Sequence, residues 1–308
     1  MLALDMVWNP SKGIDLGFFT LHYYSLMWIV AFLLGFNIMK RIYKNENQTK
    51  ESLDSLFIYS VLGIMLGARL GHVIFYQREL ISEDFFSIFL PFKFAGGFEF
   101  TGFQGLASHG AAIGMIISMY LYNKKVLKKT IIWILDRVVV PVALGAVFVR
   151  IGNFINSEII GKATESSLGV RFVQDYYNKY QIVKVTGIQD VNEAYAAVGS
   201  DPKYAELLNK VPLRHPAQLY EAGSYILVFL ILLYCYWKTN KRQQPGFLFG
   251  LFLVLLWTVR FFVEFVKEPQ GDEYLTMLGL NTGQLLSIPF ILIGLYFMFM
   301  YKPKTKLA

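Results

Sequence analysis

Long apolar stretches alternate with short polar segments along most of the chain. Seven of these stretches hold about 20 residues each, which is enough for a helix to cross the hydrocarbon core of a bilayer. They cover residues 20–39, 54–76, 105–123, 131–154, 219–237, 246–266 and 283–301. The pattern predicts an all-α polytopic membrane protein with seven transmembrane helices.

Basic residues mark every second connection between these stretches. One set follows spans one, three, five and seven: Lys40, Arg41, Lys44, Lys50, Lys124, Lys125, Lys128, Lys129, Lys238, Lys241, Arg242, Lys302, Lys304 and Lys306. The opposite short segments hold only Lys12, Arg78, Lys93 and Lys267. By the positive-inside rule we expect the N-terminus outside and the C-terminus in the cytoplasm, which agrees with an odd number of spans. The segment before span one has no basic region, so we expect a retained helix and not a cleaved signal peptide.

Two of the outward segments are longer than simple turns. Residues 77–104 fit either an element lying in the membrane interface or an irregular aromatic loop packed on the helices. Their phenylalanines include Phe85, Phe86, Phe89, Phe92, Phe94 and Phe98. The other segment balances basic and acidic side chains and predicts a small extracytoplasmic head domain, with helix N-caps at Asp190 and Asp201. Spans one to four, the head, and spans five to seven then occupy residues 1–156, 157–214 and 215–308.

The composition agrees with a membrane protein and narrows its partners. Of the 308 residues, 55% are hydrophobic and only 17% are charged, below the proportion of about a quarter that is usual for soluble domains. The formal charge of +7 comes mostly from the cytoplasmic loops, where it faces anionic lipid, and so it does not argue for nucleic-acid binding. The only cysteine, Cys235, cannot form an intrachain disulfide.

Ionisable and amide side chains within the spans gather on one side of the predicted bilayer. A charge at the centre of a transmembrane helix costs roughly 2.5–3.5 kcal/mol on insertion scales, so each one is expected to have a partner or a function. The residues in the outer half are Tyr24, Arg69, His109, Arg150, Asn153, Asn156, His215, Gln218, Tyr220, Glu221, Arg260 and Glu264. Their placement predicts a single site that opens to the outer leaflet. Glycines repeated every four residues, such as Gly63, Gly67 and Gly71, are interpreted as helix-packing residues only.

Several arginines at headgroup depth favour a phospholipid as the ligand, because the guanidinium group matches phosphate oxygens. A histidine, His109, could accept a proton near neutral pH. No Ser-His-Asp arrangement or HExxH motif is evident, and the candidate histidines lack the carboxylate spacing of a metal site. We therefore expect no metal or other cofactor, and a nucleophile supplied by the second substrate. Two assignments stay open: Arg260 with Glu264 could be a structural ion pair, and His215 with Pro216 could simply shape the start of span five.

Six short segments carry the most specific motifs of the chain. They are His22-Tyr23-Tyr24-Ser25, Ala68-Arg69-Leu70-Gly71, Ser108-His109-Gly110, Arg150 to Glu158 with Gly161, His215-Pro216-Ala217-Gln218-Leu219-Tyr220-Glu221 and Arg260-Phe261-Phe262-Val263-Glu264-Phe265. At these segments, and in their order, the chain resembles the bacterial phosphatidylglycerol–prolipoprotein diacylglyceryl transferases over nearly its whole length. It departs from the family pattern without losing a charged or hydrogen-bonding residue, at Ala111, Val149, Ser157 and Ile160.

The resemblance implies an enzyme of the bacterial cytoplasmic (inner) membrane. It would move the diacylglyceryl group of phosphatidylglycerol to the thiol of a lipobox cysteine in a prolipoprotein, so that a thioether forms and glycerol phosphate leaves. In this interpretation Arg150 and Arg260 bind the phosphate, His109 helps to deprotonate the thiol, and Glu264 holds Arg260. An arginine–glutamate pair is the alternative for the acid–base role. The other residues expected to contact phosphatidylglycerol are Tyr24, Arg69, Asn153, Asn156, Glu158, His215 and Gln218.

A transporter or flippase for an anionic solute or lipid is the alternative function, since buried arginines beside a cavity would serve it equally well. Against it, the sequence has no apparent inverted repeat and no matching pair of broken helices in two halves. Its polar residues also gather on one side and do not line a path across the membrane. A purely structural scaffold would leave the convergence of so many costly charged groups unexplained.

Overall fold

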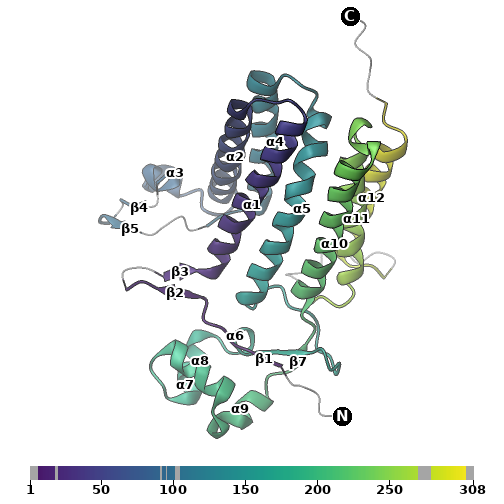
Figure 1. Cartoon of the computed structure of the whole chain (residues 1–308). Coiled ribbons are helices and arrows are strands. Elements are labelled where there is room, and N and C mark those ends of the chain that lie inside the picture. Colours follow the sequence, from purple (N-terminus) through teal and green to yellow (C-terminus); the bar gives the residue numbers. More distant parts are fainter. Residues whose placement is uncertain are drawn as a thin grey trace, which may run out of the picture. The chain divides into compact units, whose positions relative to one another are not determined.

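The computed structural model describes residues 6–17, 20–90, 92–94, 96–100, 105–269 and 279–302 (Figure 1). A few predicted positions lie outside these residues: Pro91, Ala95 and residues 101–104 of the phenylalanine-rich segment, and the basic residues Lys304 and Lys306. The chain forms two compact units. The first unit consists of Met1–Asn37 with Leu135–Ala308, and the second unit of Ile38–Ile134.

Each of the seven predicted spans contains a helix. The helices are α1 (Tyr23–Asn45), α2 (Lys50–Tyr76), α4 (Ser108–Tyr122), α5 (Ile131–Ile155), α10 (Ala217–Lys238), α11 (Phe247–Val263) and α12 (Thr282–Phe299). Among the described residues, five helices are long and apolar enough to cross a membrane, namely α1, α2, α5, α10 and α12. The other two are shorter, with 17 residues in α11 and 15 in α4. The protein is therefore a mostly helical membrane protein, with five candidate spans among the residues that the structure describes.

In the second unit, α2 and α4 pack side by side along small residues (Figure 1). A Cβ atom added at Gly67 would lie 2.8 Å from the Cα of Gly114, and one added at Gly71 would lie 2.6 Å from the Cα of Gly110. Any side chain at these positions would force the helices apart, because ordinary contacts begin at about 3.4 Å. The interpretation of these glycines as helix-packing residues is confirmed. After α4 the helix continues as one π-helical segment, η2 (Asn123–Leu127).

The connection between α2 and α4 is built from short elements. They are α3 (Leu80–Glu83), the 3-10 helix η1 (Phe85–Ile88), and a hairpin of β4 (Phe92–Lys93) with β5 (Glu99–Phe100). Asp84 precedes η1, and its carboxylate accepts a hydrogen bond of 2.7 Å from the backbone N–H of Phe94. This bond ties the start of the connection to the hairpin.

In the first unit, α11 packs between α10 and α12, and the 3-10 helix η4 (Asn240–Gln243) joins α10 to α11 (Figure 1). Asp136 of α5 caps the beginning of α11, because its carboxylate accepts hydrogen bonds from the backbone N–H groups of Gly246 at 2.7 Å and Phe249 at 2.9 Å. The free N–H groups of a helix start are favourable partners for a buried carboxylate. This contact fixes the register of α11 against α5.

The same unit contains a small mixed subdomain. Its three-stranded sheet has the order β1-β6-β7, in which β1 (Met6–Trp8) is parallel to β6 (Val170–Phe172) and β7 (Leu213–Arg214) is antiparallel to β6. Its helices are α6 (Val173–Tyr176), α7 (Lys179–Thr186), α8 (Val191–Ser200), η3 (Pro202–Tyr204) and α9 (Ala205–Asn209). A separate hairpin of β2 (Gly13–Asp15) and β3 (Thr20–His22) leads into α1, so this helix begins three residues later than predicted.

The subdomain has its own apolar core and well-formed helix starts. The core is formed by Val173, Tyr177, Ile182, Ala194, Tyr195, Val198 and Val211. The predicted N-caps are confirmed: Asp190 accepts from the backbone of Glu193 at 2.8 Å, and Asp201 accepts from that of Lys203 at 2.9 Å. The sequence did not reveal that β1, far away in the chain, would complete the sheet.

Candidate functional site

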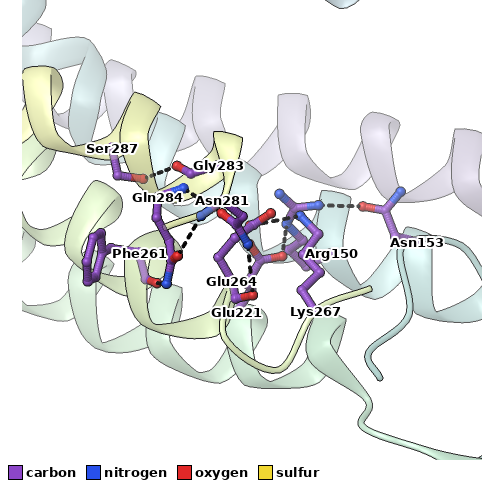
Figure 2. A network of polar contacts seen from close by, with 10 residues as sticks. All are labelled: Arg150, Asn153, Glu221, Phe261, Glu264, Lys267, Asn281, Gly283, Gln284 and Ser287. Atoms are coloured by element: carbon purple, nitrogen blue, oxygen red, sulfur yellow. Dashed lines mark hydrogen bonds and ion pairs between the residues drawn. The ribbon is translucent and has the colours of Figure 1, made fainter. Parts of the chain in front are cut away.

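A buried cluster of charges lies where α5, α10 and α11 meet (Figure 2). Arg150 is near the end of α5, and its Nε lies 2.7 Å from Oε2 of Glu221, near the start of α10. The Glu221 side chain is only 1% exposed and that of Arg150 is 14% exposed. A carboxylate this deep is stable only when it is paired, so the two side chains hold each other in place.

The end of α5 supplies a chain of hydrogen bonds beside Arg150. Its Nη1 donates to Oδ1 of Asn153 at 3.2 Å, and Nδ2 of Asn153 donates to Oε2 of Glu158 at 3.3 Å. The other carboxylate oxygen of Glu158 accepts from Nδ2 of Asn156 at 2.8 Å. The backbone can turn back toward α5 here because Ser157 adopts a left-handed conformation with a φ of 56°. A signature that is contiguous in sequence thus becomes one connected polar network.

The ring of Tyr24 packs against Gly152, a residue of the same helix end as Arg150 and Asn153. A Cβ atom added at Gly152 would lie 2.6 Å from Cδ2 of the Tyr24 ring, so the ring occupies the space that a side chain would need. Tyr24 is the second residue of α1. The predicted juxtaposition of Tyr24 with the Arg150 segment is therefore present.

A second ion pair follows α11 (Figure 2). Nζ of Lys267 lies 3.6 Å from Oε2 of Glu264, and the Lys267 side chain is 3% exposed. Burial lowers the pKa of Lys267, although Glu221 and Glu264 act in the opposite direction. Glu264 rests against Gly283 of α12, where an added Cβ atom would lie 2.5 Å from its Oε1. Sequence reasoning treated Lys267 only as a loop charge, and its spacing of three residues from Glu264 was the signal that could have found it.

Arg260 completes the cluster. Its guanidinium carbon lies 5.4 Å from the centroid of the Trp257 ring, a cation–π arrangement. Its buried Nε has no hydrogen-bond partner among the described residues. In the part of the chain that the structure describes, the ion pair of Glu264 is formed with Lys267, so the predicted support of Arg260 by Glu264 is not among the contacts seen.

Arg260 belongs to neither ion pair of this cluster among the described residues. Glu221 is paired with Arg150, and Glu264 is paired with Lys267. A guanidinium outside both ion pairs, whose buried Nε has no hydrogen-bond partner among the described residues, favours the binding of an anionic group.

A backbone strap holds the end of α11 close to the start of α10. The N–H of Gly161 donates to the carbonyl of His215 at 2.9 Å, and the N–H of Lys162 donates to that of Val266 at 2.8 Å. Gly161 also forms an antiparallel bridge with Lys267. These bonds connect the site to the β-sheet subdomain, because Arg214 at the end of β7 also forms an ion pair with Glu268.

His215 and Gln218 lie beside this strap. Nδ1 of His215 is 3.2 Å from the hydroxyl of Tyr220, and Nε2 of Gln218 donates to the carbonyl of Glu158 at 2.6 Å. Gln218 is fully buried, yet its Oε1 has no hydrogen-bond partner among the described residues, and neither has Oγ of Ser157. The site therefore also contains unfilled hydrogen-bond acceptors.

Arg69 and His109, the two remaining predicted site residues, belong to the second unit. The Arg69 guanidinium donates to backbone carbonyls of the connection between α2 and α4. His109 is exposed at the start of α4, and its ring lies 4.9 Å from that of Phe75 and 5.9 Å from that of Tyr76. The structure thus brings together the predicted residues of the first unit: Tyr24, Arg150, Asn153, Asn156, Glu158, His215, Gln218, Glu221, Arg260 and Glu264.

Comparison with known proteins identifies the family of this chain. The family model for prolipoprotein diacylglyceryl transferase matches residues 12–300. The phosphatidylglycerol–prolipoprotein diacylglyceryl transferase of Bacteroides fragilis is 37% identical over 306 residues, which are 98% of each chain. That of Tolumonas auensis is 36% identical over 294 residues (95% and 96%), and that of Helicobacter pylori is 30% identical over 296 residues (93% and 90%). Because the family model and these relatives match nearly the full length of the chain, the chain belongs to the prolipoprotein diacylglyceryl transferase family.

Proposed function

We propose that this protein transfers the diacylglyceryl group of phosphatidylglycerol to the lipobox cysteine of a prolipoprotein. The cysteine sulfur forms a bond to the glyceryl carbon that carries the phosphate ester. The carbon–oxygen bond to the phosphate breaks, and glycerol phosphate leaves with the bonding electrons. The thiol proton passes to a base. The chain's relatives are named for this reaction, and the observation that carries it here is the buried Nε of Arg260, which has no partner among the described residues and lies outside both ion pairs.

Arg150 and Arg260 take the role of phosphate ligands in this proposal. Negative charge grows on the phosphate as the carbon–oxygen bond breaks, and fixed guanidinium donors stabilise that charge without reorganising. The 2.7 Å contact with Glu221 keeps the Arg150 side chain oriented. The Arg150 Nη1 donates to Asn153, and in this proposal other N–H groups of Arg150 donate to the phosphate of the substrate. Arg260 has an unfilled N–H donor among the described residues, which suits an incoming phosphate oxygen.

The remaining polar atoms suit the glycerol headgroup. Hydroxyl groups are donors, and Oε1 of Gln218 and Oγ of Ser157 are buried acceptors without a partner among the described residues. Asn153 and Asn156 donate hydrogen bonds to Glu158, and Tyr24 packs against Gly152. These contacts fix the orientation of the three side chains. His215 is placed near the start of α10 by its contact with Tyr220.

His109 is the proposed base for the thiol, whose ordinary pKa of about 8.5 leaves little thiolate near neutral pH. The alternative base is a glutamate of the cluster, Glu264, acting together with a neighbouring cation. Replacing His109 by glutamine separates the two, because only the first assignment predicts a large loss of transfer that is partly restored at alkaline pH, where more thiolate is present.

We further propose seven crossings, with the N-terminus, the head subdomain and the active site on the outer side. Backbone pairing supports the number. β1 precedes α1, and its partner β6 follows α5, so paired strands on one side of a membrane would need an even number of crossings between them. This supports α4 as a crossing along with α1, α2 and α5. Gly161 likewise pairs with Lys267, which follows α11, and this supports α10 and α11 crossing as a pair. With α12 this gives seven helices, and the basic loops give the orientation.

The decisive experiment measures transfer from labelled phosphatidylglycerol to a lipobox peptide. Purified protein would be placed in vesicles in which phosphatidylglycerol is the only phospholipid. We expect Arg150→Gln and Arg260→Gln to lose transfer by orders of magnitude, while Arg41→Gln, at an exposed arginine near the end of α1, retains it. Near-normal transfer by a properly inserted Arg260→Gln protein would refute the phosphate-binding role.

A further inference from the structure

A patch of exposed phenylalanines lies on the connection between α2 and α4. It is called the aromatic segment here and consists of residues 85–98, as far as the structure describes them. The exposed fractions are 54% for Phe85, 64% for Phe86, 44% for Phe89, 40% for Phe94 and 72% for Phe98. Exposed apolar patches of this kind on a protein surface usually mark a contact with a partner or a membrane.

The rings of the aromatic segment contact one another and so form one continuous surface. Phe92 and Phe98 are stacked with centroids 4.9 Å apart, Phe86 lies 6.0 Å from Phe94, and Phe85 lies 5.7 Å from Phe89. Because most of these rings remain exposed in spite of the contacts, the patch is not a small core of its own. It presents several aromatic faces and edges outward together.

The position of the aromatic segment along the chain identifies what covers it. It follows α2, a candidate membrane span, and precedes α4, whose first turn packs against the end of α2. The end of a spanning helix lies at the membrane surface, so a segment that directly follows α2 is expected at that surface. At that depth an apolar ring can enter the boundary between headgroups and acyl chains while neighbouring polar groups stay in water.

One buried arginine holds this connection together. Arg69 is 9% exposed; its Nε donates to the carbonyl of Ile88 at 3.2 Å, its Nη2 to that of Ser87 at 2.8 Å, and its Nη1 to that of Gly105 at 3.4 Å. The first two carbonyls belong to the end of η1, and the third lies just before α4 begins. A single planar guanidinium therefore joins α2, the aromatic segment and the start of the helix that carries His109.

We infer that the aromatic segment is a membrane-interface element that binds phospholipid at the headgroup–acyl boundary, and that Arg69 is the positioning residue that holds it there. This gives Arg69 a backbone-holding role in place of the headgroup contact expected from sequence. The inference does not depend on the transferase reaction, because it concerns only how the second unit meets the bilayer. It favours the interfacial element over the packed aromatic loop that the sequence also allowed.

The test uses the fact that Cys235 is the only cysteine. In a Cys235→Ser background, Phe86→Cys would be labelled with the fluorophore NBD, in vesicles of phosphatidylglycerol and phosphatidylethanolamine with spin-labelled lipids. Tyr180→Cys in α7 is the matched control, since Tyr180 is an aromatic residue of 76% exposure on a different element. We expect blue-shifted emission at position 86, quenched more by a spin label near the headgroup than by one deep in the chain, and no such quenching at position 180. Emission at position 86 that is unquenched, or quenched no more than at position 180, would overturn the inference.

The role of Arg69 is tested in the same labelled protein. Arg69→Gln should abolish the depth-dependent quenching at position 86, whereas a label at Leu62→Cys, an exposed position within α2, should keep its quenching by deep spin labels. Asp84→Asn, which weakens the hydrogen bond to Phe94, should shift position 86 in the same direction and serves if the Arg69 variant does not insert. Unchanged quenching at position 86 in either inserted variant would show that Arg69 and its neighbours do not position the segment.

Discussion

Replacing Gly161 by alanine tests whether the backbone strap sets the geometry of the site. The added Cβ atom would lie 2.5 Å from Cβ of His215, 2.6 Å from its carbonyl oxygen and 2.7 Å from the carbonyl oxygen of Val266. These distances fall short of the 3.4 Å at which ordinary contact begins by about 0.7–0.9 Å. The obstructing atoms belong to two separate segments and two of them are backbone, so no side-chain rotation can relieve the overlap.

Two consequences follow from this displacement. Overpacking of this kind typically costs about 1–3 kcal/mol of folding free energy. Moving Lys267 and its neighbours by most of an ångström should also slow transfer, since a misplacement of about 1 Å in a catalytic site can cost about 100-fold. We therefore expect Gly161→Ala to lower the thermal unfolding midpoint and to reduce transfer from labelled phosphatidylglycerol by about 10- to 100-fold.

Gly223→Ala is the matched control, because this glycine is in the interior of α10 and an added Cβ atom would meet no other atom within 4 Å. The greater helix propensity of alanine should leave stability equal or raise it by up to about 1 kcal/mol, with transfer unchanged. Unfolding would be followed by intrinsic fluorescence in detergent micelles, and transfer in vesicles. If Gly161→Ala matched the unsubstituted protein in both measurements, the crowding argument would be wrong.

Three further predictions concern the charge cluster and the helix pair of the second unit. Glu221→Gln should destabilise the protein by about 3–5 kcal/mol, because it leaves the mostly buried Arg150 without its carboxylate partner. A double-mutant cycle with Arg150→Gln should show strong coupling between the two positions. Additive effects of the two substitutions would contradict the pairing. Burial lowers the pKa of Lys267, so its ammonium group loses a proton at a lower pH in the folded chain than in the unfolded chain. The free energy of unfolding should therefore rise with pH between the lowered pKa and the ordinary lysine pKa of about 10.4. Lys267→Met should remove that rise from the alkaline unfolding curve, and an identical pH dependence in both proteins would count against it. Gly114→Ala should lower the unfolding midpoint, with a loss of about 1–3 kcal/mol, because its Cβ atom would lie 2.7 Å from the Cα of Gly67; an unchanged midpoint would mean that the helices can separate freely.

The helices could be predicted from sequence because bilayer-length apolar runs have few alternatives. Each expected span contains a helix, but the boundaries depend on tertiary contacts: residues 20–22 form β3 because they pair with β2. The lengths of α4 and α11 left five clear candidate spans instead of seven. The apolar runs therefore predict the helices, whereas the exact start of α1 is set by the hairpin of β2 and β3.

The site was predictable where its residues are neighbours in sequence. Arg150, Asn153 and Glu158 lie within one helix end, so their network follows from local geometry. The three-residue spacing marks Lys267 as a possible partner of Glu264, but the sequence alone does not decide between Lys267 and Arg260, because both cations lie about one helical turn from the glutamate.

Arg69 shows a kind of contact that the sequence does not indicate. Its guanidinium donates to backbone carbonyls, which every residue has and no motif reveals, and a contact with the lipid headgroup stays a prediction.

The parallel pairing of β1 with β6 has a practical consequence for handling this protein. During synthesis, Met6–Trp8 can form its strand hydrogen bonds only after the ribosome has made Val170–Phe172. If β1 were deleted or blocked by a fusion at that position, the central strand β6 would become an open edge, available to a strand from another molecule. Purification handles are therefore better placed after α12, where no described strand depends on them.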